Sequence, residues 1–317
     1  MFENSDGLIK KRERLINAGH FGSLSQGGVF NPGGLEIDGR VHLLCRAEAS
    51  DATWTGAFRE TRAAAFWCEL DDDLVLRDFA ALSHHAESEQ RPEDWRLFHH
   101  GGRVFSNHSV YSWGDDQMRC HVAVSEVDLE RRYIGRGQTF TTSLPPRTQE
   151  KNWAMFSHRG RLLCIYSIDP YIVLEIDLGT GETEIAVTGG SFEFAVGYRS
   201  GFGLFNSTNP IVWDDDRYLT FFHTYMRSSV PRDRNRLYLQ YAMLIDRETL
   251  LPTAVTSEPV VTGGGEEGIH PGVHYTMSLA RHGDDLCAFY GEGDTHTGLL
   301  VIDRKKLNQA LRPAGRR

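Results

Sequence analysis

The sequence has 317 residues, of which 40% are hydrophobic and 24% are charged, and this ordinary globular composition excludes a disordered or collagen-like chain. Its 34 basic and 43 acidic residues leave a formal net charge of −9. That balance excludes a protein that coats DNA or RNA, because binding a phosphate backbone needs a basic face, but it leaves room for one small phosphate.

No apolar run reaches the roughly 20 residues of a membrane helix, and the first residues lack the apolar stretch of a secretory signal. We therefore expect a cytoplasmic protein with no membrane partner. The five cysteines are widely spaced without a Cys-x-x-Cys pair, so we expect neither a disulfide framework nor a metal site. Cys45, Cys164 and Cys287 stand in apolar runs and are interpreted as buried side chains.

In chain order, helical periodicity is confined to residues 8–15 and 304–311, and everything between them reads as short strands. One unit recurs there, in which two apolar strands flank a turn of Gly, Asp or Arg. Its copies cover residues 35–44, 96–105, 154–163, 211–219 and 278–286. The turns fall near positions 39, 102, 160, 216 and 284, a spacing of about 60 residues that allows about four strands per unit.

Five such units predict an all-β chain that forms a five-bladed β-propeller with short terminal helices. A single four-stranded blade cannot cover its own apolar faces, whereas a ring of blades buries each face against the next. We expect one domain over residues 1–317, because no linker rich in Ser and Pro divides the chain. An irregular β-sandwich or two small β domains is the alternative.

Polar segments introduce the first strand of each unit, where a simple strand would not need them. They are residues 31–34, 93–96, 150–153, 207–210 and 270–275. Because the innermost strands of a propeller line one funnel, these segments should converge on a single spot. Carboxylates, amides and tryptophans gathered there are typical of a sugar site, in which aromatic faces stack on the ring and polar groups bind hydroxyls.

Several of these motifs resemble glycoside hydrolase family 130. The segment Phe30-Asn31-Pro32-Gly33-Gly34, followed by Leu44-Cys45-Arg46-Ala47-Glu48, resembles the first blade of that family. Glu93-Asp94-Trp95-Arg96 is similar to its Glu-Asp-Pro-Arg motif, and Tyr290-Gly291-Glu292-Gly293-Asp294 to its Tyr-Gly-Ala-Ala-Asp motif. Asn209-Pro210 and the later His223 match its fourth-blade pattern. The similarity spans roughly residues 20–300 through short motifs.

The resemblance implies a five-bladed enzyme that cleaves or forms a glycosidic bond with inversion, as a β-mannoside-type phosphorylase or hydrolase. It also implies that Asp94 is the general acid and acts through a substrate hydroxyl. Two positions depart from the family. Trp95 replaces the proline beside the acid, and the segment around Lys151 only loosely matches the family's third-blade lysine.

These considerations assign three sets of candidate residues. The catalytic candidates are Asp94, Asp294 and Glu48, since an inverting hydrolase needs a base to activate water and a phosphorylase does not. The substrate-binding candidates are Asn31, Arg46, Glu93, Trp95, Arg96, Asn152, Trp153, Asn209, His274 and Tyr290. The anion-binding candidates are Lys151, Arg199 and His223. Because successive strand residues face opposite ways, Glu93 and Asp94 are not expected to share one site as an acid pair.

We expect a small carbohydrate substrate and no cofactor, with inorganic phosphate or a sugar phosphate as a co-substrate. Each charged candidate could instead belong to a structural ion pair. Three other functions stay open. They are a glycosyltransferase of the same fold that uses an activated sugar donor, a non-catalytic sugar-binding propeller, and an interaction propeller without a polar funnel. The sugar, its linkage and the oligomeric state are left undetermined.

Overall fold

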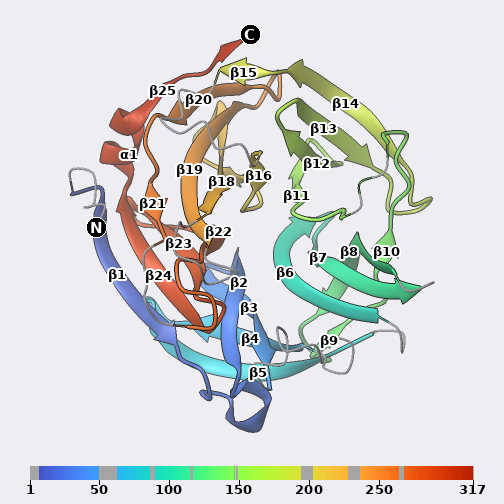
Figure 1. The fold of residues 1–317 in the computed structure, drawn as a ribbon, viewed down its shortest axis with the longest axis vertical. Coiled ribbons are helices and arrows are strands. Elements are labelled where there is room, and N and C mark those ends of the chain that lie inside the picture. The colour runs from blue at the N-terminus through green and yellow to red at the C-terminus, as the bar shows by residue number, and fades with distance from the viewer. Residues whose placement is uncertain are drawn as a thin grey trace.

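The computed structural model describes residues 7–49, 63–85, 90–114, 117–145, 147, 149–193, 203–227, 236–263 and 268–316. Over these residues the chain is almost entirely β-structure, with a 3-10 turn at Gly22–Ser25 and one α-helix, α1 (Arg304–Ala310). The predicted all-β class is therefore confirmed. Figure 1 shows the sheets arranged around a centre, with β2, β6, β11, β16 and β22 nearest to it.

Consecutive antiparallel groups of strands follow one another along the chain. The first group is β2 (Gly28–Ile37), β3 (Arg40–Glu48), β4 (Ala64–Leu70) and β5 (Leu76–His84). The next is β6 (Gln90–His100), β7 (Arg103–Gly114) and β8 (Gln117–Asp128), with β10 (Gln138–Thr139) on β8. β9 (Tyr133–Ile134) pairs with both β5 and β8 and joins these two groups into one sheet.

The remaining groups continue around the ring. One consists of β11 (Ala154–His158), β12 (Arg161–Ile168), β13 (Tyr171–Ile176) and β14 (Thr183–Gly190). Another is built on β18 (Arg217–Arg227), β19 (Arg236–Asp246) and β20 (Pro252–Thr256), together with β16 (Phe205–Asn206), β17 (Ile211–Val212), β21 (Val261–Thr262) and β25 (Leu311–Pro313). The last consists of β22 (His274–His282), β23 (Asp285–Glu292), β24 (His296–Asp303) and β1 (Ile9–Ile16). A short pair, β15 (Phe192–Glu193) with β26 (Gly315–Arg316), lies outside these groups.

The hairpins predicted from the repeating unit are all present. β2 and β3 pair up to Ile37 and Arg40, so the loop is Asp38-Gly39, and both of its residues have positive φ. Positive φ at both central residues is the geometry that matches the twist of two antiparallel strands. The other hairpins are β6–β7, β11–β12, β17–β18 and β22–β23.

Neighbouring groups pack face to face through separate hydrophobic clusters, and the series of clusters closes on itself. Alternation along the strands explains how, because successive side chains face opposite sides of a sheet. Phe221 packs toward the last group while Phe222 packs toward β11–β13. Leu43 packs toward the last group while Leu44 packs toward β6. Each sheet therefore buries both faces, and the ring holds together without a disulfide among the described residues, where all five cysteines are free and buried.

The two chain ends differ in how well the sequence predicts them. The C-terminal helix is confirmed as α1, which is capped by Asp303 accepting from the backbone of Lys305 and Lys306. The predicted N-terminal helix over residues 8–15 is wrong, since this segment is strand β1 paired with β24 along the outer edge of the ring (Figure 1). Pairing satisfies the backbone of β24 and buries Ile16, and these tertiary gains outweigh the weak local preference for helix.

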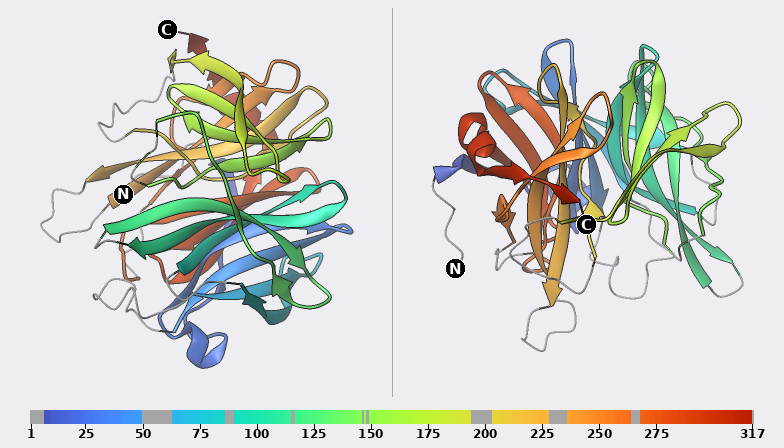
Figure 2. Two further views of the ribbon diagram at one scale, coloured as in Figure 1. Left: turned by 90° about the vertical axis from the view of Figure 1, so that its right-hand side faces the viewer. Right: turned by 90° about the horizontal axis from the view of Figure 1, so that it is seen from above.

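The side views show that the strands of each sheet run roughly along the axis of the ring (Figure 2). None of the helices within the described ranges is long and apolar enough to cross a membrane.

Candidate functional site

Four polar residues with left-handed backbone mark one end of the central strands. Asn31, Asp94, Asn152 and Asp294 have φ of 53°, 60°, 60° and 52°. Asn and Asp tolerate this conformation better than other side chains, and such strained positions cluster at functional sites. The strain also breaks the β2–β3 and β6–β7 ladders, which shift register between Phe30 and Gly33 and between Glu93 and Arg96.

The broken ladder at β6 corrects one prediction. Strand alternation predicts that Glu93 and Asp94 face opposite ways, yet both contact the guanidinium of Arg46. The positive φ at Asp94 turns its side chain toward the same partner as Glu93. Asp94 also accepts a hydrogen bond from Asn31 Nδ2 at 2.8 Å. The two motifs therefore meet through side chains, as the convergence of the polar segments predicts.

Arg46 is the centre of a buried charge network. Its Nε donates to Glu48 Oε1 at 2.7 Å, its Nη2 lies 2.8 Å from Glu93 Oε2, and its Nη1 lies 3.2 Å from Asp94 Oδ1. Phe30 lies under the guanidinium, with its ring centroid 4.9 Å from Cζ. Arg46 is 4% exposed whereas Asp94 is 18% exposed, so the network presents Asp94 as its most accessible member.

A second arginine, which the sequence reasoning missed, completes this network. Arg91 Nη2 donates to Glu48 Oε1, and Arg91 Nε lies 3.5 Å from Glu93 Oε2. Its side chain is 1% exposed. The one signal in the sequence is its spacing, because Arg91 stands two residues before Glu93 on the same strand and so faces the same side.

Three acidic groups whose charges interact with Arg46 differ in proton affinity. Burial raises the pKa of Glu93 to about 7, against the opposing effect of Arg46. Burial also raises the pKa of Asp94, but Arg46, the hydrogen bond from Asn31 and Arg96 together outweigh it and hold that pKa below its usual value. Burial raises the pKa of Asp294 to about 6, with Arg46 opposing. Asp94 is therefore the carboxylate held ionised, whereas Glu93 and Asp294 exchange their protons nearer neutral pH.

Arg96 forms the second part of the site. Its Nε donates to the backbone carbonyl of Ser207 at 2.9 Å, and its Nη2 donates to Asn152 Oδ1 at 3.2 Å and to the hydroxyl of Tyr275. Tyr275 in turn donates to Asn152 Oδ1 at 2.8 Å. These described partners are all neutral, so a guanidinium that is 3% exposed keeps its positive charge unpaired beside Asp94.

Lys151 and His223 lie near this guanidinium. Among the described residues no carboxylate pairs with Lys151, and its charge acts on both Asp294 and His223. Burial, with Arg96 and Lys151, lowers the pKa of His223 to about 3. His223 is therefore neutral and hydrogen-bonded to Ser207 Oγ at 2.9 Å. Because that hydroxyl donates to Gln240 Oε1, the imidazole proton lies on Nδ1, and Nε2 can accept a hydrogen bond but offers an anion neither a donor nor a charge. Arg199, the other predicted anion ligand, lies outside the described residues.

Both tryptophans predicted to stack on substrate are core residues, and this prediction is wrong. Trp95 is 0% exposed and packs among Leu44, Ala65 and other apolar side chains. Trp153 is 3% exposed and donates from Nε1 to Glu150 Oε2. Each directly follows a left-handed residue of the site, and its ring lies in a hydrophobic cluster between the sheets rather than toward the centre.

Three further predicted binding residues are also committed to the protein interior. His274 and Tyr290 are buried and stack on each other, with ring centroids 3.8 Å apart. Asn209 accepts from the backbone of Met155 at 2.8 Å and donates to Asn107 Oδ1 at 2.9 Å. The hydrogen bonds of Asn209 tie neighbouring sheets together, whereas His274 and Tyr290 stack within one sheet.

An array of aromatic rings beside the site was not foreseen. Phe205, His223, Tyr225 and Tyr238 lie on one face of β16, β18 and β19, with neighbouring centroids 5.1 to 6.0 Å apart and interplanar angles of 12° to 30°. Tyr275 meets His223 and Tyr238 edge-on. The sequence signal was the alternating aromatic pattern of the two strands, which reads equally well as core. Phe205, Tyr225 and Tyr238 are half-buried.

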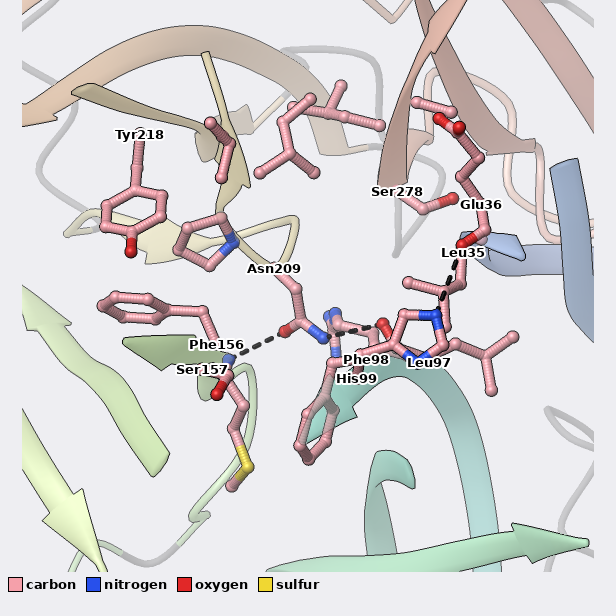
Figure 3. Close-up of a pocket in the computed structure, with 18 of the residues that line it drawn as sticks. Leu35, Glu36, Leu97, Phe98, His99, Phe156, Ser157, Asn209, Tyr218 and Ser278 are labelled. Atoms are coloured by element: carbon pink, nitrogen blue, oxygen red, sulfur yellow. Dashed lines mark hydrogen bonds between the residues drawn. The ribbon is translucent and has the colours of Figure 1, made fainter. Parts of the chain in front are cut away.

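The opposite end of the centre holds a different hollow, of about 380 Å³. Figure 3 shows Leu35, Phe98 and Phe156 around it, with Asn209 in its wall. The polar groups there are already bonded within the protein. His99 Nε2 contacts Glu36 O, and Ser278 Oγ donates to Pro32 O. Arg96 also lines this hollow, so it separates the apolar end of the centre from the charged one. The charged end is therefore the candidate active site.

No cluster of His, Cys, Asp and Glu placed to hold a metal ion occurs in the part of the chain that the structure describes. The carboxylates at the site are instead matched by arginines.

The comparisons with known proteins rest on structure alone. No family model matches the sequence, and no curated protein matches it. Solved structures do match. The β-1,2-mannobiose phosphorylase from Listeria innocua, solved with β-1,2-mannobiose, has a TM-score of 0.65 at 15% identity, covering 95% of this chain and 99% of that one. This chain has the same fold.

Two further structures agree. A mannose phosphorylase from Leishmania mexicana, solved with a phosphate ion, has a TM-score of 0.59 at 12% identity and covers 87% of this chain and 84% of its own. A structure from the GH130 family, in which glycoside hydrolases target β-1,2 mannosidic linkages in Candida mannan, has a TM-score of 0.60 at 13% identity, with 93% and 88% covered. At such identities the similarity establishes the fold.

Proposed function

We propose that this protein is a five-bladed β-propeller enzyme that cleaves a β-mannoside-type glycoside with inversion, using inorganic phosphate as the attacking group. The observation that carries the proposal is the pairing of an accessible carboxylate with unpaired cations. Asp94 stands between Arg46 and Asn31, while Arg96 and Lys151 lie nearby without a carboxylate partner among the described residues.

Five blades account for the strand pairing and for the closure of the ring. Each antiparallel group begins at one of the recurring hairpins, and one hydrophobic cluster lies between each neighbouring pair. Strand β9 joins the first two groups at their outer edges and leaves their inner strands separate. A single ring of this kind is consistent with one domain over residues 1–317.

Asp94 supplies the proton in this proposal. Cleavage requires a proton at the leaving oxygen, delivered directly or through a substrate hydroxyl, while the nucleophile attacks the anomeric carbon from the opposite face. One oxygen of Asp94 is held by Asn31 and Arg46, which fixes the orientation of the carboxyl group. Desolvation by a bound sugar raises the pKa of a carboxyl group and so favours its protonated form.

Phosphate would be held by the charged groups of Arg96 and Lys151. Guanidinium and ammonium groups are the side chains that bind phosphate most strongly. In the balanced reaction a phosphate oxygen bonds to the anomeric carbon and the glycosidic C–O bond breaks. The leaving oxygen takes the proton from Asp94, and the products are a sugar 1-phosphate of inverted configuration and a shortened saccharide.

The sugar itself would contact amide groups and aromatic rings. Asn31 and Asn152 carry amides at the left-handed positions beside Asp94. The half-buried rings of Phe205, Tyr225 and Tyr238 offer the apolar surface that the buried tryptophans do not. The similar structures solved with β-1,2-mannobiose and with a phosphate ion support small carbohydrate and phosphate as the ligands. The reaction needs no cofactor, and the cytoplasm is the compartment that supplies free phosphate.

The proposal is tested by mass-spectrometric detection of products from a panel of β-mannosides, with and without inorganic phosphate. We expect a sugar 1-phosphate that forms only with phosphate present and that disappears in the Asp94→Asn variant. Asp303→Asn, at the cap of α1 far along the chain, serves as the control that should keep the activity. Lack of any product with the whole panel would overturn the proposal and favour a nucleotide-sugar transferase or simple sugar binding.

Hydrolysis is the second candidate, and Asp294 favours it. A hydrolase needs a base that is ionised near neutral pH, and a carboxyl group with a pKa of about 6 meets this requirement. Free sugar formed equally with and without phosphate, and lost in Asp294→Asn, would establish hydrolysis in place of phosphorolysis.

A further inference from the structure

Four buried charges form a closed ring behind Asp94. Arg46 contacts Glu48 and Glu93, and Arg91 contacts the same two carboxylates from the other side. The side chains are 4%, 3%, 7% and 1% exposed for Arg46, Glu48, Glu93 and Arg91. Guanidinium and carboxyl groups alternate around this ring, so each carboxyl group contacts two guanidinium groups.

This ring of charged side chains determines which nitrogen of Arg46 contacts Asp94. Two of its nitrogens, Nε and Nη2, are engaged by Glu48 and Glu93, and this leaves Nη1 directed at Asp94. Removing Arg91 would leave Arg46 alone with three carboxylates in a buried region. An uncompensated buried charge is strongly unfavourable, so such a cluster would rearrange or take up a proton. Arg91 itself has no described contact with Asp94.

We propose that Arg91 is a positioning residue of this site, which acts through Glu48 and Glu93 to hold Arg46 against Asp94 and to keep Asp94 ionised in the free protein. The inference rests on the proposed function, because that function gives Asp94 the role of acid. The effect of Arg91 on the pKa of Asp94, however, concerns the free protein and can be measured without a substrate.

The surroundings of Asp94 determine the sign of the effect. The charged and titratable groups that face it come from β3, β6, β7, β22 and the segments before β11 and after β23. Those that interact with Asp94 directly are Arg46, Glu93, Arg96, Tyr111, Tyr275 and Asp294, and those that act on Glu93 or Asp294 are Glu48, Arg91 and Lys151. Replacing Arg91 by a neutral side chain removes one positive charge and lets the two glutamates draw Arg46 away. Both changes favour protonated Asp94, so its pKa must rise.

The test is a carbon-detected NMR titration of the Asp94 carboxyl group in the unliganded protein. We expect Arg91→Met to raise its pKa by about one unit or more, as for the loss of a nearby opposite charge, and Arg91→Lys to raise it less. Arg103→Met removes an exposed arginine on β7, paired with Glu126, and should leave the titration unchanged. A titration of Asp94 in folded Arg91→Met within about 0.2 units of the parent would overturn the inference.

A double variant separates charge from simple loss of packing. Arg91→Met with Glu48→Gln removes one charge of each sign from the ring, so the pKa of Asp94 should return toward that of the parent. If the double variant instead shifts it as far as Arg91→Met does, the ring does not act through charge and the inference fails. This pair also guards against misfolding of the single variant, because the double variant leaves no unpaired carboxylate.

Kinetic measurements test the effect of Arg91 on catalysis. In a parent enzyme that cleaves glycosides, Arg91→Met should move the pH above which kcat declines up by about one unit, because the pKa of Asp94 rises. KM should change less than about threefold, because Arg91 does not touch substrate. An unchanged pH profile of kcat would overturn the positioning role. If the parent cleaves no glycoside at all, the proposed function fails, whereas the NMR titration still decides whether Arg91 controls Asp94.

Discussion

Two opposing effects act on the carboxylate of Asp94. Burial favours its protonated form, while Arg46 and the hydrogen bond from Asn31 favour its ionised form and outweigh burial. Because its pKa is lowered, Asp94 is protonated in fewer molecules at a given pH. A modest change in its surroundings therefore changes the fraction of molecules in which Asp94 can donate a proton.

Asn31 allows this balance to be tested with a small change. Asn31→Gly keeps the left-handed backbone, which glycine adopts freely, and removes the hydrogen bond to Asp94. Because a bond to the charged form is lost, the pKa of Asp94 rises and the pH above which kcat/KM declines should move up by about one unit. Profiles of kcat/KM from acidic to neutral pH measure this shift.

Asn152→Gly is the matched control. It has the same backbone conformation, but its amide contacts Arg96 and Tyr275 rather than Asp94. The pH above which kcat/KM declines should be the same in this variant as in the parent, even if KM rises. An unchanged or lower pH of decline in Asn31→Gly would contradict the role of Asn31.

The raised pKa of Asp294 predicts that the stability of the protein depends on pH. Its pKa in the folded protein, about 6, lies above the ordinary value of 3.8, so the folded state binds the proton more tightly than the unfolded state does. This contribution is fully present below the unfolded pKa and is lost as the pH rises through about 6. Asp294→Asn should therefore stabilise the protein by about 1–2 kcal/mol at pH 7.5 relative to its effect at pH 4.

Urea unfolding of parent and Asp294→Asn at both pH values measures this difference. Asp285→Asn, whose side chain lies in an exposed ion pair with Lys10, provides the comparison and should show no such gain at the higher pH. Equal effects of Asp294→Asn at pH 4 and 7.5 would show that burial of its charge costs the fold nothing.

At the scale of single strands, the site depends on how closely β2 approaches β6. A Cβ added at Gly33 would lie 1.8 Å from the backbone oxygen of Trp95. The two strands therefore need glycine at this point, immediately after the register shift that presents Asn31. The close approach brings Asn31 within hydrogen-bonding distance of Asp94, so the strand geometry and the chemistry are linked.

Gly33→Ala should destabilise the protein by about 3 kcal/mol or more, because backbone and not a flexible side chain occupies the space. Activity should fall as well, since β2 can accommodate the methyl group only by moving Asn31 away from Asp94. Gly135→Ala is the control, with its nearest neighbour at 3.4 Å. Chemical denaturation of the two variants makes the comparison, and a loss below about 1 kcal/mol for Gly33→Ala would mean that β2 and β6 separate easily.

At the scale of the whole molecule, strand β1 closes the ring. It comes from the N-terminal end of the chain but pairs with β24 from the C-terminal end, and its Ile16 is 0% exposed in the cluster between the first and last groups. The first and last parts of the chain are thus held in one sheet. Unfolding of the ring should accordingly be one cooperative transition.

Ile16→Ala tests closure. Loss of a fully buried Ile side chain should lower the free energy of unfolding by about 3 kcal/mol while unfolding stays a single transition. Lys11→Ala, an exposed change on the same strand, should have little effect. Two separate transitions in a calorimetric scan of either variant would contradict a single cooperative ring.

Local patterns in the sequence were sufficient for the repeating unit. Asp38-Gly39 and Arg159-Gly160 are turn sequences whose residues accept positive φ, and the flanking alternation of apolar side chains determines which residues pair across the hairpins. The same patterns predicted the all-β class, the buried cysteines and the capped helix α1. Asn31 and Asp94 stand in the polar segments that open the first two units and Arg46 on a strand after a turn, and the resemblance to family 130 singled out Asp94 as the acid.

Only the tertiary structure decided the rest, since each of those features depends on residues far apart in the chain. β1 is a strand because β24 offers an unpaired edge, and Trp95 is core because its neighbouring sheet faces it. Glu93 and Asp94 share Arg46 because a left-handed residue breaks strand alternation, which no pattern of apolar residues reports. Arg91 likewise depends on the tertiary structure, because its partner Glu48 lies 43 positions away in the chain. Their buried ion pair is recognisable only when the two strands lie side by side.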